Sequence, residues 1–374
     1  MNRRHFIALS AAGVAQLMLA DLPGNQLWAK SHDRKRYSVV ILGDTHYDTE
    51  PASVYHSDYN ETVEWLNRVQ RAEFARNGEM WRERCPQLLH RAAGLVRKDT
   101  RMALQMGDLI QGDCGNPEVH ARMLMESLDY MKHELHDLPF VTVVGNHDIR
   151  GTGAEECYHR VMPERMSLEL GVPVGKTTFS YNIDDDAYIV VDFNKPDYAE
   201  LERQLEQTKG ARHTFVVSHG PIFPFDASSC RWFFLGGKSS ADARRHFRAL
   251  FAQRNAICLC GHVHRTELLD WQGDGGRITQ LTMNSVWTEK TPVEYNPMSV
   301  GAESYGLLRK DMKNDDGTPI ADEMPLFDEY RPGLLRYEVA DCAGSYRLCV
   351  DGEHVNVEFY GGASKKLTRR FELR

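Results

Sequence analysis

The sequence predicts an α/β fold, a four-layer α-β-β-α sandwich in which two mixed β-sheets pack together between outer helices. Three observations predict it. Short apolar runs bounded by glycine alternate with helical patterns through the earlier part of the chain. Strand patterns without helices between them follow. Polar segments stand where several apolar runs end, so a site is expected at the strand ends.

The strands of the first kind are short, continuous and apolar, which is typical of strands buried on both faces of a sheet. They are expected at 37–42, 102–106, 140–144, 215–217 and 256–260. Helical patterns lie between them, at 59–76, 81–97, 117–136, 199–208 and 241–254. Strands that alternate with helices in this way predict parallel βα units.

A second class of strands has no intervening helices and predicts a second sheet. Residues 178–183 and 187–193 are interpreted as a hairpin joined through three aspartates. Later candidates are 277–284, 334–339, 346–350 and 355–360, of which the last three are expected to complete the second sheet. Residues 290–333, rich in Pro, Gly, Asp and Asn, are expected to form a long surface excursion.

The first 29 residues are predicted to be an export signal and not part of the fold. Arg3 and Arg4 precede an apolar stretch that ends near Ala20, which is too short and too interrupted for a stable membrane span. The paired arginines resemble a twin-arginine signal with cleavage after Ala29; a Sec signal or an uncleaved anchor is the alternative. The signal predicts a periplasmic or extracellular protein that engages the export machinery.

The net charge of the chain indicates which partners it disfavours. A formal net charge of −8 provides no electrostatic footprint for nucleic acid or an anionic membrane.

Eight cysteines in an exported chain could form disulfides. Cys342 and Cys349 flank a predicted turn at 343–345 and are the best candidate pair, whereas Cys258 and Cys260 are expected to be small core residues.

Five short segments carry metal-binding side chains at the ends of the apolar runs. They are Gly43-Asp44-Thr45-His46, Gly107-Asp108, Gly145-Asn146-His147-Asp148, Ser218-His219-Gly220 and Gly261-His262-Val263-His264. Each segment alone is a weak signal, but the ordered set predicts one site for two divalent metals. Oxygen and imidazole ligands without thiolate suit Zn, Mn or Fe and exclude a structural zinc knuckle.

The spacing within the segments supports this chemistry. Residues two apart in extended backbone project to one side, so Asp44 and His46 can hold one ion together. Two metals roughly 3.5–4 Å apart activate a bridging hydroxide for in-line displacement at phosphorus. His147 follows Asn146, so it is expected to face the substrate and protonate the leaving oxygen, while Asp148 holds its other ring nitrogen.

The ordered motifs D-x-H, G-D, G-N-H-D, H and G-H-x-H, over residues 37–290, resemble those of the calcineurin-like metallophosphoesterase superfamily. The resemblance implies a two-sheet sandwich flanked by helices. It also implies two ligand sets, Asp44, His46, Asp108 and His264 for the first metal and Asp108, Asn146, His219 and His262 for the second, with His147 as the acid.

Departures from the family pattern disfavour two branches of the family. Gln111 stands where purple acid phosphatases place an iron-binding tyrosine, and Gln111-Gly112 replaces the Asp-Arg of protein Ser/Thr phosphatases. Both branches are disfavoured, which leaves a resemblance to exported bacterial phosphoesterases. Asp113 is expected in an exposed loop, with a contact to the site as the alternative. Arg150 is expected at the start of a helix capped by Thr152, with a contact to a substrate phosphate as the alternative.

The region 59–97 is expected to lie near the site, with Trp65, Phe74 and Trp81 as packing residues. We expect a signal at 1–29, a metallophosphoesterase domain at 30–290 and a β-rich extension at 291–374 that packs on that domain. The predicted function is hydrolysis of small phosphate mono- or diesters by an exported dimetal enzyme. The alternative is a non-catalytic metal-binding or ligand-binding protein on the same scaffold, which His147 and Asp148 disfavour.

Overall fold

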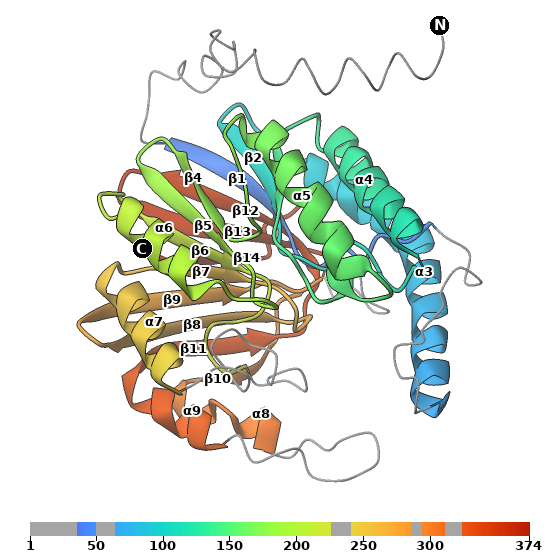
Figure 1. Ribbon diagram of the computed structural model, residues 1–374. Helices are drawn as coiled ribbons and strands as arrows, with labels where there is room; N and C mark the ends of the chain where they lie inside the picture. The colour runs from blue at the N-terminus through green and yellow to red at the C-terminus, as the bar shows by residue number, and fades with distance from the viewer. Residues whose placement is uncertain (1–35, 50–63, 115, 226–240, 286–293, 311–323) are drawn as a thin grey trace, which may run out of the picture. The chain divides into compact units, whose positions relative to one another are not determined.

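The structure, a computed structural model, describes residues 36–49, 64–114, 116–225, 241–285, 294–310 and 324–374 (Figure 1). The predicted signal at 1–29 and its cleavage site lie outside these residues. Among the residues described, no helix has the length and apolar character needed to cross a membrane.

One sheet has six strands, and its middle is the first described strand, β1. In spatial order its strands are β14 (Arg369–Glu372), β13 (His354–Gly361), β12 (Gly344–Asp351), β1 (Arg36–Leu42), β2 (Thr100–Gln105) and β3 (Phe140–Thr142). β1 pairs in parallel with β2 and antiparallel with β12, and β2 pairs in parallel with β3. The carboxyl ends of β1, β2 and β3 therefore meet at one edge.

The other sheet has eight strands. In spatial order they are β10 (Pro297–Val300), β11 (Leu334–Ala340), β8 (Thr266–Gly273), β9 (Gly276–Thr282), β7 (Ile257–Cys260), β6 (Thr214–Ser218), β5 (Asp186–Val191) and β4 (Phe179–Ile183). The pairs β5–β6, β6–β7 and β7–β9 are parallel, and the hairpin of β4 and β5 is antiparallel as predicted. Both sheets are mixed.

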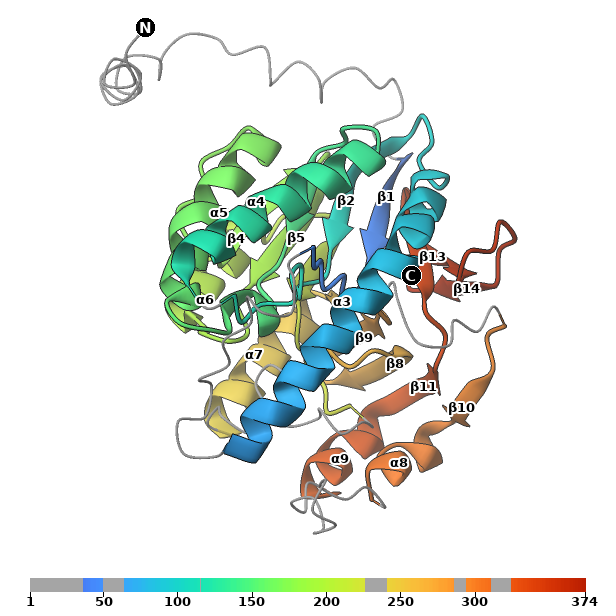
Figure 2. The same cartoon turned by 90° about the vertical axis from the view of Figure 1, so that its right-hand side faces the viewer.

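Helices cover the outer faces, so the predicted four-layer α-β-β-α sandwich is confirmed. On the side of the six-stranded sheet lie α3 (Glu64–Ala93), α4 (Pro117–Glu134) and α5 (Ala154–Leu170). On the side of the eight-stranded sheet lie α6 (Tyr198–Gln207) and α7 (Ala241–Gln253). Figure 2 shows the long helix α3 beside α4.

The helices begin where the local sequence satisfies their first amide groups. Asn116 precedes Pro117 and accepts hydrogen bonds from the backbone nitrogens of Glu118 and Val119, which caps α4. Asp197 caps α6 in the same way through Glu200. The two helices predicted at 59–76 and 81–97 form the single helix α3, which continues through Pro86.

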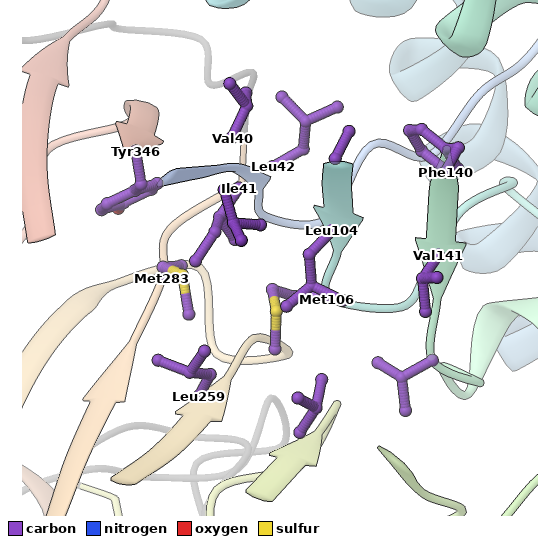
Figure 3. Close-up of a cluster of buried hydrophobic side chains, with 14 of the residues drawn as sticks. Val40, Ile41, Leu42, Leu104, Met106, Phe140, Val141, Leu259, Met283 and Tyr346 are labelled. Atoms are coloured by element: carbon purple, nitrogen blue, oxygen red, sulfur yellow. The ribbon is translucent and has the colours of Figure 1, made fainter. Parts of the chain in front are cut away.

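The core lies between the sheets (Figure 3). Strand alternation explains it, because successive side chains of one strand point to opposite faces. Leu259 of β7 packs toward Leu104 of β2 in the cluster between the sheets, whereas Cys258 and Cys260 join a second cluster that includes Phe251 of α7. The prediction that these two cysteines are small core residues is confirmed, since both are fully buried.

The last strands do not all complete the second sheet, so that prediction is wrong. Only β11 joins the eight-stranded sheet; β12, β13 and β14 extend the six-stranded one. The reason is the pairing of β12 with β1, in which Tyr37 lies opposite Val350 and Ile41 opposite Tyr346. This long-range pairing has no local signal in the sequence. β8, β10 and β14 were not predicted as strands.

The expected turn and disulfide near residue 344 are also wrong. Residues 344–351 form one strand, so most of the chain between Cys342 and Cys349 is extended backbone of roughly 3.3 Å per residue. Both thiols are free.

The predicted surface excursion at 290–333 contains further elements in its described part. They are β10, the short helices α8 (Leu307–Lys310) and α9 (Met324–Tyr330), and 3-10 turns at Ala302–Ser304 and Arg331–Gly333. Tyr305 and Phe327 are fully buried there and pack edge to face, with ring centroids 4.9 Å apart. This part of the excursion therefore joins the second hydrophobic cluster, in which Tyr305 packs against Tyr337 of β11.

Candidate metal centre

All of the predicted ligands lie in loops at the carboxyl ends of strands from both sheets. Asp44 and His46 follow β1, Asp108 follows β2, and Asn146 and His147 follow β3. From the other sheet, His219 follows β6, and His262 and His264 follow β7. Three groups result in which the ligand atoms lie within 4.8 Å of one another: Asp44 with His46 and His264, His46 with Asp108 and His147, and Asp108 with His219 and His262.

The first group joins the ends of β1 and β7. Nε2 of His264 lies 3.0 Å from Oδ2 of Asp44 and 3.1 Å from Nε2 of His46. The backbone nitrogen of His262 also donates to the Asp44 carboxylate, at 3.1 Å. Two imidazole nitrogens and one carboxylate thus converge on one point, which is the arrangement that a divalent metal requires.

Asp108 lies between the groups. Its Oδ2 is 3.2 Å from Nε2 of His219 and 3.8 Å from Nε2 of His46, and its Oδ1 accepts a hydrogen bond of 2.7 Å from the backbone nitrogen of His147. Nδ1 of His262 lies 3.2 Å from Nε2 of His219. Asp108 is therefore placed where one carboxylate can serve both metals.

Backbone strain accompanies these positions. His46, Asp108, His262 and His264 have φ angles of 44°, 49°, 73° and 49°, in the left-handed region that non-glycine residues rarely adopt. Each such residue costs on the order of 1 kcal/mol, and such strain clusters at functional sites. All four of these strained residues are predicted metal ligands.

The glycines of the motifs are required by close packing. A side chain on Gly107 would place its first carbon 2.5 Å from Nδ1 of His219, and one on Gly145 would collide with the backbone nitrogen of Asp108. The loops from the two sheets are therefore in direct contact, and glycine permits that contact.

Gln105, which was not predicted, connects the loops after β1 and β2 to the end of β3. It is fully buried at the end of β2, where Nε2 donates to the carbonyl of Gly107 at 2.6 Å and contacts Thr45 Oγ1 at 3.2 Å. Its Oε1 accepts from the backbone nitrogen of Gly107 and from the hydroxyl of Thr142. An amide side chain inside an apolar strand was the signal that could have identified it.

The buried carboxylates raise the pKa of two histidines that face them. Burial opposes a charged His219, but the carboxylates of Asp108 and Asp44 outweigh it and raise its pKa to about 9. Burial alone would raise the pKa of Asp108, but the nearby His219 and His147 hold it well below the usual range. Nδ1 of His219 lies 2.6 Å from the carbonyl of Met106, so it carries the hydrogen and Nε2 faces Asp108.

The residues fit a pair of divalent metals. Burial holds the pKa of His46 well below its ordinary value and lowers that of His262 to about 3, so both are neutral imidazoles, the form that binds metals. Oδ1 of Asn146 is a buried oxygen with no hydrogen-bond partner. A buried unpaired amide oxygen is costly unless it has a ligand to bind.

His147 lies beside the ligands with its ring held from one side. Its Nδ1 is 2.8 Å from the carbonyl oxygen of Gln111 and 3.1 Å from Nη2 of Arg150, and its ring stands edge-on to that of His46, with centroids 4.5 Å apart. Burial lowers the pKa of His147 to about 3, and the Arg150 charge adds to the lowering.

Asp148 does not hold the ring of His147, so that prediction is wrong. Its Oδ2 accepts from the backbone nitrogen of Gly145 at 2.8 Å, and its Oδ1 from that of Ile110 at 3.1 Å. The short 3-10 turn His147–Ile149 directs Asp148 into the loops, away from its neighbour. Burial raises the pKa of this carboxyl to about 7, and the nearby charge of Asp108 contributes. Asp148 therefore stabilises the loop backbone at Gly145 and Ile110.

Two further predictions near His147 need correction. Asp113 is 1% exposed and lies inside the structure, not in an exposed loop, and its Oδ2 is 2.7 Å from Nε of Arg150. The residue before α5 is Gly153, with φ 67° and no side-chain cap, so Thr152 does not cap the helix.

Helix α3 reaches the site, as expected for the region after the first motif. Nδ2 of Asn77 donates to Oε1 of Gln111 at 3.2 Å. Trp81 is buried and packs edge-on against Tyr47, with centroids 4.9 Å apart, so its predicted packing role is confirmed. The side chains of Trp65 and Phe74 lie outside the described set.

Comparisons with known proteins agree with the geometry. The family described as calcineurin-like phosphoesterase matches residues 37–266. No curated protein sequence matches the chain. A solved structure titled "Structure of PhoD" is 9% identical, with 91% of this chain and 69% of that chain covered and a TM-score of 0.51, which shows a similar fold.

Two further solved structures are similar over most of their length. GAP50, the anchor in the inner membrane complex of Plasmodium, is 13% identical, with 91% of this chain and 89% of that chain covered and a TM-score of 0.43. A dimetal phosphatase from Danio rerio is 10% identical, with 90% and 98% covered and a TM-score of 0.45.

Proposed function

The chain belongs to the calcineurin-like phosphoesterase family, and from that premise we propose that it hydrolyses mono- or diesters of phosphate on small molecules with two divalent metals. One observation carries the proposal. Asp108 lies between two ligand groups that unite carboxylates and imidazoles from both sheets. A single structural ion would need only one such group.

The ligand sets divide around Asp108. Asp44, His46, Asp108 and His264 would hold one metal, and Asp108, Asn146, His219 and His262 the other. When bound, two metals supply Lewis acidity at the phosphoryl oxygens and lower the pKa of a water molecule. Mixed nitrogen and oxygen ligands suit Zn, Mn or Fe.

His147 supplies the proton for the leaving group. Water adds its oxygen to phosphorus, the ester P–O bond breaks, and the departing oxygen takes a proton from Nε2 of His147. When Nδ1 accepts a hydrogen bond from Arg150, the neutral ring carries its hydrogen on Nε2, so Nε2 is the nitrogen that makes this transfer. Asp148 holds the backbone of the same loop through Gly145 and Ile110.

Metal reloading of the full-length chain tests the proposal. The protein is stripped by a chelator, reloaded with Zn, Mn or Fe, and assayed on 4-nitrophenyl phosphate and bis(4-nitrophenyl) phosphate while bound metal is counted. We expect about two metals per chain and turnover of at least one ester. Two bound metals without turnover of either ester would favour the non-catalytic binding protein.

The role of His147 has its own test. His147→Asn is expected to keep both metals but lose roughly 10²–10⁴-fold in kcat on esters with poor leaving groups. His133→Asn, in an exposed part of α4, is the control and should change neither quantity. Unchanged kcat in His147→Asn would remove the residue from the mechanism.

We also propose that the protein is exported in a folded state through a twin-arginine pathway. Arg3 and Arg4 before an apolar stretch support it. The cysteines of the described residues are free, which is compatible with folding in a reducing cytoplasm. Replacing both arginines by lysine should retain the chain in the cytoplasm of a bacterium that has the pathway. Export of the wild type from a strain without the pathway would indicate the Sec route instead.

A further inference from the structure

We propose that Asp113 and Arg150 are positioning residues for His147: their ion pair holds the imidazole from behind so that Nε2 is aimed at the leaving oxygen. This inference rests on the acid role of His147 in the proposed function. It concerns residues outside the metal ligands and outside the five sequence motifs that predicted the site.

A chain of contacts runs from Asp113 through Arg150 to the ring of His147. Oδ2 of Asp113 lies 2.7 Å from Nε of Arg150, and Nη2 of the same guanidinium lies 3.1 Å from Nδ1 of His147. Because the guanidinium is planar and rigid, fixing Nε on the carboxylate also fixes where Nη2 points. Arg150 therefore reaches His147 in one orientation.

The backbone fixes the same two residues. The nitrogen of Asp113 donates to the carbonyl of Arg150 at 2.7 Å, so the loops after β2 and β3 are joined there. Gly112 and Gly151 flank this point with φ angles of 77° and 119°. A side chain on Gly112 would collide with the carbonyl of His147, so the two loops pack without space between them.

The contacts at Nδ1 determine the direction of the ring. A carbonyl oxygen can only accept and a guanidinium can only donate, so Gln111 and Arg150 suit different states of Nδ1. In either state Nδ1 faces Gln111 and Arg150, and Nε2 lies on the other side of the ring. Turning the ring over would lose both contacts.

Burial makes the pair act as one unit. The Asp113 side chain is 1% exposed and that of Arg150 is 14% exposed. Removing one partner of a buried ion pair is strongly destabilising. Loss of Asp113 should therefore disturb His147 through Arg150, although no contact between Asp113 and the ring is needed.

The arrangement also explains how His147 is held without its sequence neighbour. The carboxylate of Asp148 is taken up by two backbone amides of the loops. The side chains that face Nδ1 come instead from Arg150 and from Gln111, whose amide Nε2 lies 3.4 Å away. Gln111 is steadied in turn by Asn77 of α3.

Leaving-group dependence tests the inference, because only an ester with a poor leaving group needs the proton. The metal-loaded full-length variants Arg150→Ala, Arg150→Lys and Asp113→Asn are compared with wild type on aryl esters from 4-nitrophenyl to phenyl. A misplaced catalytic group costs up to about 10²-fold. We expect kcat to fall about 10- to 100-fold on the phenyl ester and only a few-fold on the 4-nitrophenyl ester. Arg150→Lys should recover part of the loss.

A matched control separates positioning from stability. Arg248 pairs with Asp274 at 2.7 Å, and its side chain is 11% exposed, which is close to the burial of Arg150. Arg248→Ala should reduce thermal stability without changing the leaving-group dependence. Metal content should equal that of wild type in all of these variants. In the double variant Asp113→Asn/Arg150→Ala, the losses should not multiply, because both residues act through one contact.

The outcomes are distinct. A loss in Arg150→Ala and Asp113→Asn that is equal for all esters, as in Arg248→Ala, would overturn the positioning role. So would unchanged kcat in both variants. If His147→Asn shows the steep leaving-group dependence and the Arg150 and Asp113 variants do not, this inference fails alone. If His147→Asn itself lacks that dependence, the acid role in the proposed function fails, and the inference fails with it.

Discussion

The two sheets contribute different chemistry to the metal centre. Loops of the six-stranded sheet supply every predicted oxygen ligand, namely Asp44, Asp108 and Asn146, together with His46 and the proposed acid His147. Loops of the eight-stranded sheet supply imidazoles alone, from His219, His262 and His264. Neither half contains a full ligand set, so the site exists only where the two sheets meet.

The sheets also differ in how the chain builds them. The eight-stranded sheet uses a single stretch, from Phe179 in β4 to Ala340 in β11. The six-stranded sheet combines the first described strands with the last ones, and β12, β13 and β14 carry no predicted site residue. The half of the site that carries His147 therefore belongs to a sheet that is completed by strands without any predicted site residue.

The largest expected effect comes from removing the residue that joins the two halves. In Asp108→Ala, we expect kcat/KM to fall at least about a thousandfold, because several kcal/mol of charge stabilisation are lost with the bridging carboxylate. Metal analysis should show less than two metals per chain. Full activity with two bound metals would mean that Asp108 is not a ligand common to both metal sites.

The next prediction separates stability from chemistry within the six-stranded sheet. Phe371 of β14 is 1% exposed and packs edge-on to Tyr295, so Phe371→Ala should cost about 3–5 kcal/mol of unfolding free energy. kcat of the metal-loaded variant should be unchanged well below its melting temperature. Leu367→Ala, at a position 37% exposed, is the control and should cost far less in urea unfolding. A kcat defect in Phe371→Ala would show that the last strands shape the site.

Metal removal probes the contact between the sheets. Metals that bind only the folded protein add about 2.7 kcal/mol of stability at a concentration one hundred times their Kd. A chelator should therefore lower the melting temperature of wild type by several degrees. The same chelator should leave Asp108→Ala nearly unchanged. An equal fall in melting temperature in wild type and Asp108→Ala would show that stabilisation by the metals does not depend on Asp108.

The smallest effect concerns His120, which supports the loop of the six-stranded sheet. It is buried in α4, with Nε2 2.8 Å from the carbonyl of Asp148, and burial lowers its pKa from 6.5 to about 4. Because the folded pKa is the lower one, the unfolded chain binds the extra proton, and stability falls as pH drops from 6.5 toward 4. The loss should reach about 2 kcal/mol at pH 5.

Urea unfolding at pH 7 and pH 5 measures the effect of His120. His120→Gln should show a smaller loss of stability between the two pH values than wild type. His133→Gln, at an exposed position of the same helix, should behave as wild type. A wild-type loss that His120→Gln does not reduce would assign the acid sensitivity to another group.

Sequence reasoning succeeded where a local pattern carries the information. An apolar run followed by Asp44-x-His46 or His262-x-His264 identifies both a buried strand and the ligands at its end. These residues lie close together because parallel strands place their carboxyl ends at one edge. The predicted sandwich follows from the same alternation of strands and helices.

It failed where a contact joins distant segments. Nothing local distinguishes a strand that pairs with β1 from one that pairs with β8, so β12 was assigned to the wrong sheet. The same holds for Asp113 and Arg150, whose ion pair depends on how two loops pack. Asp148 was assigned to its neighbour His147, because adjacency in the sequence does not show which way a tight turn directs a side chain.

The pairing of β1 with β12 sets an order of events during synthesis. Arg36 lies opposite Asp351, so β1 gains this partner only after the chain from β2 to β11 has been made. Pairing over such a separation is slow, since a long loop must close first. The eight-stranded sheet can assemble earlier from its continuous stretch. The six-stranded sheet, whose loops carry the predicted oxygen ligands, is therefore the later of the two sheets to be completed.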